Sequence, residues 1–232
     1  MDHPHRGDIV SFEGFGPDAF RFLQALDFHQ SRDWFAENRA IYEAQLREPL
    51  LAFGEEGAAR ARDAGLAMRF DARKGPFRIN RDVRFSKDKG PYNKHVSAVL
   101  SADGTKGDYG VLYVHVGLEE TFFAAGFWAL PKEVLEPFRR HVLTYPDRYR
   151  ALVEALGGDG LTFGDEGALK RLPRGYDDPG DPVLGAALRL RGFTVSESFP
   201  RELVHSRALL DRFGAFAASA KPLLDWGRAI LA

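Results

Sequence analysis

Cationic side chains that can bind anionic groups are concentrated in one stretch of the chain, residues 73–95. Its sequence is RKGPFRINRDVRFSKDKGPYNKH, in which eight Lys and Arg stand against two Asp, a local net charge of +6. The whole chain has a formal net charge of −1, so the remaining residues sum to −7. A basic stretch in a near-neutral chain predicts a local site for an anionic group, whereas a nucleic-acid-coating protein would be basic over a wide surface.

Side chains with suitable donors for such a site occur in this stretch and in a second basic loop at 170–176. Guanidinium, ammonium, amide and hydroxyl groups all donate hydrogen bonds to phosphate or carboxylate oxygens. The expected ligand-binding residues are Arg78, Asn80, Arg81, Asp82, Arg84, Ser86, Lys87, Lys89, Tyr92, Lys170 and Arg174. The alternative is a solvated face whose arginines pair with acidic side chains elsewhere in the fold.

Alternation with a period of two predicts that residues 77–86 form a strand. The apolar residues of one parity are Phe77, Ile79, Val83 and Phe85. The polar residues of the other parity are Arg78, Asn80, Asp82, Arg84 and Ser86. Arg81 lies on the apolar parity, so we expect either a bulge or a buried guanidinium that is paired with a carboxylate.

The run FRINRDVRFSKDKGPYNKH at 77–95 closely resembles the signature of a bacterial family named domain of unknown function 2461. Supporting similarity lies in RDWFAENRAIY at 32–42, LKRLPRGY at 169–176 and GFTVS at 192–196, so the resemblance extends over nearly the whole chain. The resemblance implies a soluble α+β protein and brings no activity with it. The functional hypotheses therefore rest on the residues themselves.

The remaining pattern predicts a single α+β domain over residues 1–232, with an antiparallel meander sheet packed by N- and C-terminal helices. Pro17 and Ser31 are expected to begin helices, and Pro49 should kink or split the second one. The expected regions are helical at 17–65, sheet-rich at 77–129 and helical at 131–232, with a short strand near 193–195. The expected strands of the meander are 77–86, 95–101, 109–117 and 121–129.

Acid–base or metal chemistry has few candidates in this sequence. The phosphate-binding-loop, G-x-S-x-G and H-E-x-x-H motifs are absent. Asp82 and His95 are the two residues that we single out as candidate acids or bases. His95 and His115 would face each other in a hairpin centred near residue 105, but no third metal ligand accompanies them. We expect neither a metal nor another cofactor.

The composition narrows the class of protein further. The 232 residues include no cysteine, which excludes disulfides, thiolate nucleophiles and cysteine-ligated metal clusters. The N-terminal residues lack an apolar signal-peptide core, and the longest apolar run, 122–130, is too short to span a bilayer. We therefore expect a cytoplasmic protein without membrane contact.

Three functional hypotheses follow from these observations. The first is a binding site for a small phosphate- or carboxylate-bearing ligand, formed by the basic strand and loop at 78–95. The second is a hydrolase or transferase that acts on a phosphorylated substrate at the same place. The third is a nucleic-acid-binding or protein-interaction module without catalysis. The oligomeric state is not determined by the sequence.

Overall fold

The protein combines helices with one antiparallel sheet, which confirms the predicted α+β class. The computed structural model describes residues 11–84, 87 and 89–232. Its elements in chain order are α1 (Ala19–His29), α2 (Arg32–Tyr42), the π-helical turn η1 (Glu43–Arg47), α3 (Glu48–Asp63), β1 (His95–Leu100), β2 (Val111–Gly117), β3 (Thr121–Phe127), α4 (Lys132–Thr144), α5 (Pro146–Gly158), α6 (Pro182–Arg189), β4 (Phe193–Ser198), the 3-10 turn η2 (Arg201–His205) and α7 (Ala208–Leu231).

The sheet is a meander in the order β1-β2-β3-β4, with every pair antiparallel. Its fourth strand is β4, not the predicted strand at 77–86. In and beside that segment, the described residues form two isolated bridges, Pro76 to Ala98 and Asn80 to Tyr92. Six positions separate Ala98 from Tyr92 but only four separate Pro76 from Asn80. This slip of register interrupts the ladder, so the described residues 77–84 form no continuous strand.

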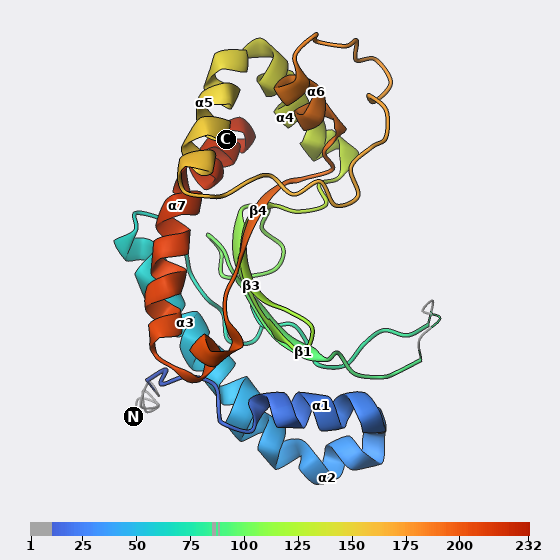
Figure 1. The fold of residues 1–232 in the computed structure, drawn as a ribbon, viewed down its shortest axis with the longest axis vertical. Helices are drawn as coiled ribbons and strands as arrows, with labels where there is room; N and C mark the ends of the chain where they lie inside the picture. The colour runs from blue at the N-terminus through green and yellow to red at the C-terminus, as the bar shows by residue number, and fades with distance from the viewer. Residues whose placement is uncertain (1–10, 85–86, 88) are drawn as a thin grey trace, which may run out of the picture.

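One face of the sheet is covered by α3 and α7, which lie side by side along it (Figure 1). Phe53 of α3, Phe123 of β3 and Phe213 of α7 are fully buried, and their ring centroids lie 5.1 to 6.4 Å apart. Burying each such side chain contributes roughly 1.5–3 kcal/mol. The contact between helix layer and sheet therefore forms a large part of the core.

The opposite face of the sheet is not covered by any helix in the described part of the chain (Figure 1). Alternation along the strands places His95, Ser97, Tyr113, His115 and Phe122 on this open face, because their neighbours in the chain face α3 and α7.

A capping serine and a proline mark where the helices α2 and α3 begin. Ser31 is the N-cap of α2, where its hydroxyl accepts a hydrogen bond from the Trp34 N–H at 3.2 Å. Pro49 lies in the first turn of α3, directly after the π-helical turn, so the expected interruption of the long helix is confirmed.

The helices α4, α5 and α6 lie at one end of the sheet, with the C-terminal half of α7 (Figure 1). Phe138, Phe193 and Trp226 join α4, β4 and α7, with ring centroids 5.2 to 5.4 Å apart. The hairpin of α1 and α2 lies at the other end of the molecule. Among the described residues, no helix combines the length and apolar character needed to cross a bilayer.

Candidate functional site

The basic stretch forms a projecting arm at the edge of β1. We use the term arm for residues 75–94, of which the structure describes all but 85, 86 and 88. Its two segments are held together by hydrogen bonds from the Arg81 N–H to the Pro91 oxygen (2.8 Å) and from the Asn93 N–H to the Ile79 oxygen (2.7 Å). The arm runs away from the sheet on the side of its open face (Figure 1). It therefore forms a wall beside that face.

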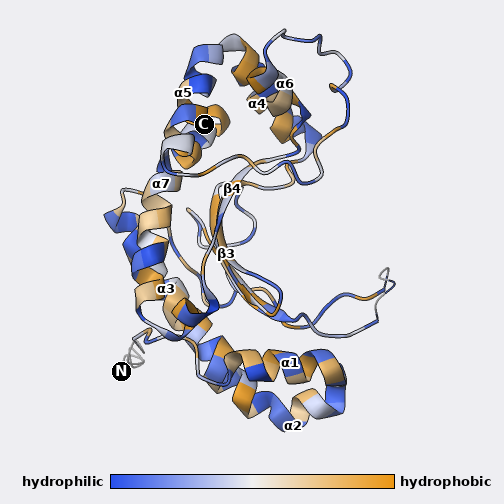
Figure 2. Cartoon of the chain, in the orientation of Figure 1, coloured by the Kyte–Doolittle hydropathy of each residue, from blue (hydrophilic) through white to orange (hydrophobic). Residues whose placement is uncertain are grey.

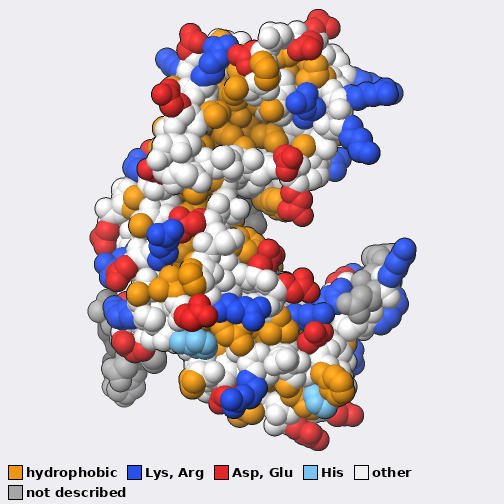
Figure 3. Space-filling view, viewed as in Figure 1, with side chains coloured by type: hydrophobic (Ala, Val, Ile, Leu, Met, Phe, Trp, Pro, Cys, Tyr) orange, Lys and Arg blue, Asp and Glu red, His pale blue; other side chains and the backbone are white. Residues whose placement is uncertain are grey.

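A groove with a volume of about 730 Å³ lies between the arm and the open face of the sheet. The residues that line the groove are Phe77, Arg78, Asn80, Arg81, Asp82, Asn93, His95, Ser97, Lys106 and Tyr113. Figure 3 shows the molecule hollowed between the arm and the helices α4 to α6. The predicted site residues that the fold brings together here are thus Arg78, Asn80, Arg81, Asp82 and His95.

Two cations, Arg78 and Lys106, meet in the groove from segments far apart in the sequence. The Lys106 Nζ donates a hydrogen bond to the Pro76 oxygen at 2.6 Å and lies 5.0 Å from the centre of the Phe77 ring. Burial lowers the pKa of Lys106, and the nearby charge of Arg78 lowers it further. Within the described ranges, neither cation forms an ion pair with a carboxylate.

The acidic residue of the groove, Asp82, is held by Arg84. The Arg84 Nε and a terminal nitrogen approach the two carboxylate oxygens of Asp82 at 2.9 and 2.6 Å. These hydrogen bonds lower the pKa of Asp82, which weakens it as a proton acceptor at neutral pH. The pair is exposed to solvent. Asp82 lines the groove and Arg84 does not, so Arg84 acts on the groove by holding the Asp82 carboxylate.

Arg81 is intermediate in burial, and the expected pairing of its guanidinium with a carboxylate stays a prediction. The register slip described above lies between residues 76–80 and 92–98, before Arg81, so it is not the bulge at Arg81 that was the alternative explanation for its parity. It frees residues 77–84 from the strict alternation of a strand: Ile79 is buried, whereas Phe77 is 43% exposed. Arg81 therefore lies along the groove wall and not within the core.

Other predicted ligand-binding residues of the arm lie away from the groove. Tyr92 is buried and stacks on Phe35 with ring centroids 4.5 Å apart, while Gln30 bonds its backbone N–H and oxygen. The Lys89 Nζ donates to the Val83 oxygen at 3.1 Å. Lys87 is exposed, and Ser86 lies outside the described residues.

The second basic loop does not approach the arm. Lys170 and Arg174 are exposed in the segment between α5 and α6. Figure 2 shows that this segment and the arm are both largely hydrophilic and lie at opposite ends of the hollow. The cation that joins Arg78 from a distant segment is Lys106, from the loop between β1 and β2.

His95 and His115 are in contact, although they are not directly opposite. His95 pairs with Gly117 and Ser97 pairs with His115, so the hairpin is centred on residue 106 and the two histidines are diagonal neighbours. Their ring centroids lie 4.2 Å apart. Gly117 leaves room for the two rings because it has no side chain. A Cβ at this position would lie only 2.8 Å from the His115 Nε2.

Burial sets the protonation of this histidine pair. It lowers the pKa of His95, and burial together with the charge of His95 lowers the pKa of His115 to about 4. The Tyr113 hydroxyl is hydrogen-bonded to the His115 Nδ1 at 3.0 Å. At neutral pH both rings are thus uncharged. The described residues contain no group of three potential metal ligands.

Five groove residues were missed from the sequence as ligand-binding candidates: Phe77, Asn93, Ser97, Lys106 and Tyr113. Tyr113 and Ser97 were accessible to reasoning from the alternation, since Tyr113 precedes His115 by two positions and Ser97 lies opposite His115. Lys106 sits in a loop of turn-forming residues, and no local pattern indicates that it points toward the arm.

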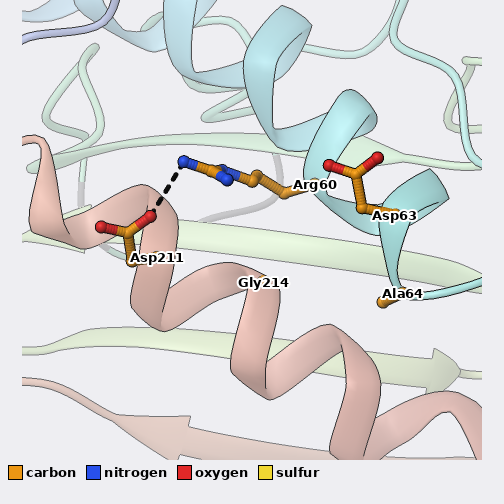
Figure 4. A pocket seen from close by; sticks show the side chains of 5 residues that line it. All are labelled: Arg60, Asp63, Ala64, Asp211 and Gly214. Atoms are coloured by element: carbon orange, nitrogen blue, oxygen red, sulfur yellow. Dashed lines mark hydrogen bonds and ion pairs between the residues drawn. The ribbon is translucent and has the colours of Figure 1, made fainter.

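A second, smaller pocket of about 320 Å³ lies between α3 and α7 (Figure 4). Its cation, Arg60, donates to Asp211 at 2.9 Å, and Asp63 also lines the pocket. The acids there outnumber the cations, so this pocket does not favour an anion.

Comparison with known proteins places the chain in a family. Residues 18–226 match the family model of domain of unknown function 2461, which is described as a conserved hypothetical protein. The chain belongs to this family. Searches of curated proteins and of solved structures gave no match.

Proposed function

We propose that the groove binds a small ligand through a phosphate or carboxylate group, with Arg78 and Lys106 as its principal contacts. The observation that carries this proposal is the convergence of the two cations, without a carboxylate partner in the described part of the chain. Like charges held together in a partly desolvated place repel each other. A bound anion removes that repulsion and restores the pKa of Lys106.

Neutral donors in the groove support the same ligand class. Asn80 is an exposed amide on the arm, and the Asn93 Nδ2 is already used by the Arg78 oxygen at 3.0 Å. Asn80 and the guanidinium of Arg78 together offer several hydrogen bonds to the oxygens of one anionic group.

An enzyme acting on such a ligand is the second candidate, and His95 is the observation that favours it. His95 lines the groove and has a lowered pKa, so at neutral pH it is free to accept a proton from a substrate or a water molecule. A hydrolase or transferase for a phosphorylated substrate is the corresponding class. Asp82 is less suited, because Arg84 already occupies its carboxylate.

Extended nucleic acid is less compatible with the charge distribution. In the view of Figure 3, Lys and Arg side chains alternate with Asp and Glu around the hollow, and no continuous basic stripe crosses it. Binding along a nucleic-acid backbone needs a series of cations that follows the phosphates.

The test is a titration of melting temperature and of binding heat with phosphate, pyrophosphate and citrate. Wild type is expected to be stabilised by at least one of them, and Arg78→Gln and Lys106→Gln should each weaken binding by about tenfold or more, as loss of a charge-assisted contact does. The matched control is Lys170→Gln, which removes the same charge from the far end of the hollow. Equal stabilisation of all four proteins would refute the groove as the anion site.

A further inference from the structure

Aromatic side chains continue from the groove across the open face of the sheet. Tyr113 and Phe122 are half-buried, and the buried His115 contacts both rings. The ring centroids of His115 and Phe122 lie 4.8 Å apart with an interplanar angle of 16°, and those of Tyr113 and Phe122 lie 5.7 Å apart. We call these three residues the aromatic band.

The aromatic band and the cations of the groove are contiguous. The Phe77 ring packs edge to face against Tyr113 at 5.9 Å, and Lys106 lies over Phe77. Tyr113 itself lines the groove. A ligand whose anionic group contacts Lys106 therefore meets an aromatic surface directly beside that group.

Small side chains continue the open face beyond the band. Ala124 pairs with Tyr113 across β2 and β3, and Ser196 pairs with Ala124 across β3 and β4. Ala124 is half-buried and Ser196 is exposed, so neither fills the open face. Neighbouring strands lie about 4.8 Å apart, so the open face from β1 to β3 spans roughly 10 Å. Beyond the band, the open face thus carries small side chains and a hydroxyl group.

We propose that the ligand is a nucleotide, with its phosphate on Arg78 and Lys106 and its base against the aromatic band. This inference rests on the anion site proposed above. Aromatic side chains on the exposed face of an antiparallel sheet stack nucleobases by their flat surfaces. The hydroxyl of Ser196 is placed to bond an edge of the base, and the uncharged histidines leave the band without a repulsive charge. A mononucleotide joins the two chemistries, an anion and a planar ring, that the groove and the band present next to each other.

The experiment measures the affinities of inorganic phosphate, ribose 5-phosphate, adenosine monophosphate and cytidine monophosphate by calorimetry. Wild type is expected to bind at least one nucleotide roughly tenfold or more tightly than ribose 5-phosphate, because base stacking contributes at least that much. Phe122→Leu should remove this advantage and leave the affinity for ribose 5-phosphate unchanged. Phe28→Leu is the control, since Phe28 is an aromatic residue that is 85% exposed on α1.

A second variant tests the same surface in case Phe122→Leu does not fold. Ala124→Leu adds a branched side chain at a half-buried strand position, where it fills the space beside Tyr113. It should weaken nucleotide binding about tenfold and leave inorganic phosphate unaffected.

The outcomes separate this inference from the proposed function. Equal binding of nucleotides and ribose 5-phosphate, both lost in Arg78→Gln and Lys106→Gln, would overturn the nucleotide and retain the anion site. A short single-stranded oligonucleotide that binds over a hundredfold more tightly than any mononucleotide would overturn the inference in favour of nucleic acid. Binding that is insensitive to Arg78→Gln and Lys106→Gln would overturn both proposals.

Discussion

Acidification should destabilise the protein through His115. This side chain is 9% exposed, stacks on Phe122, contacts His95 and is hydrogen-bonded to the Tyr113 hydroxyl at Nδ1. Protonation places a charge in a poorly hydrated position beside another histidine. The folded protein therefore resists taking up this proton.

The magnitude follows from the two pKa values of His115. Its pKa is about 4 in the folded protein, against an ordinary value of 6.5. Above pH 6.5 neither state is protonated and His115 does not change the free energy of unfolding. As the pH falls from 6.5 toward 4, the unfolded chain binds a proton that the folded chain refuses, so stability is lost. At about 1.4 kcal/mol for each pH unit, the full loss is about 3 kcal/mol.

The assay compares the free energy of unfolding at pH 7.5 and pH 4.5, measured by urea denaturation of wild type and His115→Phe. Phenylalanine keeps the stacked ring and cannot be protonated, so the variant should lose about 2–3 kcal/mol less than wild type on acidification. His29→Gln is the control, because His29 is exposed at the end of α1. Identical losses in wild type and His115→Phe would refute the proposed cause.

Three substitutions test the fold, each by urea denaturation against wild type. Gly126→Ala should lower the free energy of unfolding by more than about 2 kcal/mol, because φ is +127° there and a Cβ would lie 2.1 Å from the Phe193 oxygen. A loss below about 1 kcal/mol would show that β3 and β4 separate easily. Arg139→Leu should cost about 2–4 kcal/mol, because this buried guanidinium donates to two carbonyls at the end of α6; an unchanged midpoint would mean that water replaces it. Phe53→Ala should cost about 3–5 kcal/mol by opening a cavity between α3 and the sheet, and a smaller loss would indicate that the layers close together.

Most of the fold could be predicted because the local conformational preferences of the sequence agree with the way the elements pack. Ser31 caps α2, Pro146 and Pro182 begin α5 and α6, and the run at 121–129, apolar on both faces, marks a strand that has neighbours on both sides. In these places the preferred backbone conformation and the buried face coincide, so a single sequence suffices.

The strand at 77–86 was predicted wrongly because alternation records which side chains differ in polarity and not which register the backbone adopts. The two additional residues between Tyr92 and Ala98 are invisible in such a pattern. The same pairing depends on Gln30, which bonds the backbone of Tyr92 from the end of α1. Contacts of this range are decided by the tertiary fold.

The sequence indicated several residues of the arm that line the groove, but not the residues that meet them there. Arg78, Asn80 and Asp82 do line a groove, whereas Lys170 and Arg174 lie far from it and Lys106 takes their place. The loop at 101–110 comes close to the arm because of the turn between β1 and β2. A count of charges along the chain does not reveal this proximity.

The arm has a consequence for how the protein exchanges its amide hydrogens with solvent. Among its described residues only Gly75, Ile79 and Tyr92 are buried, and a few backbone hydrogen bonds join its two segments. A segment with so little core opens locally at a free energy well below that of global unfolding. The amides of Phe77, Arg81 and Asn93 should therefore exchange much faster than those of β2 and β3, which lie in the interior of the sheet. A ligand that bridges the arm and the sheet would slow exchange at these amides alone and leave the remaining ladder unchanged.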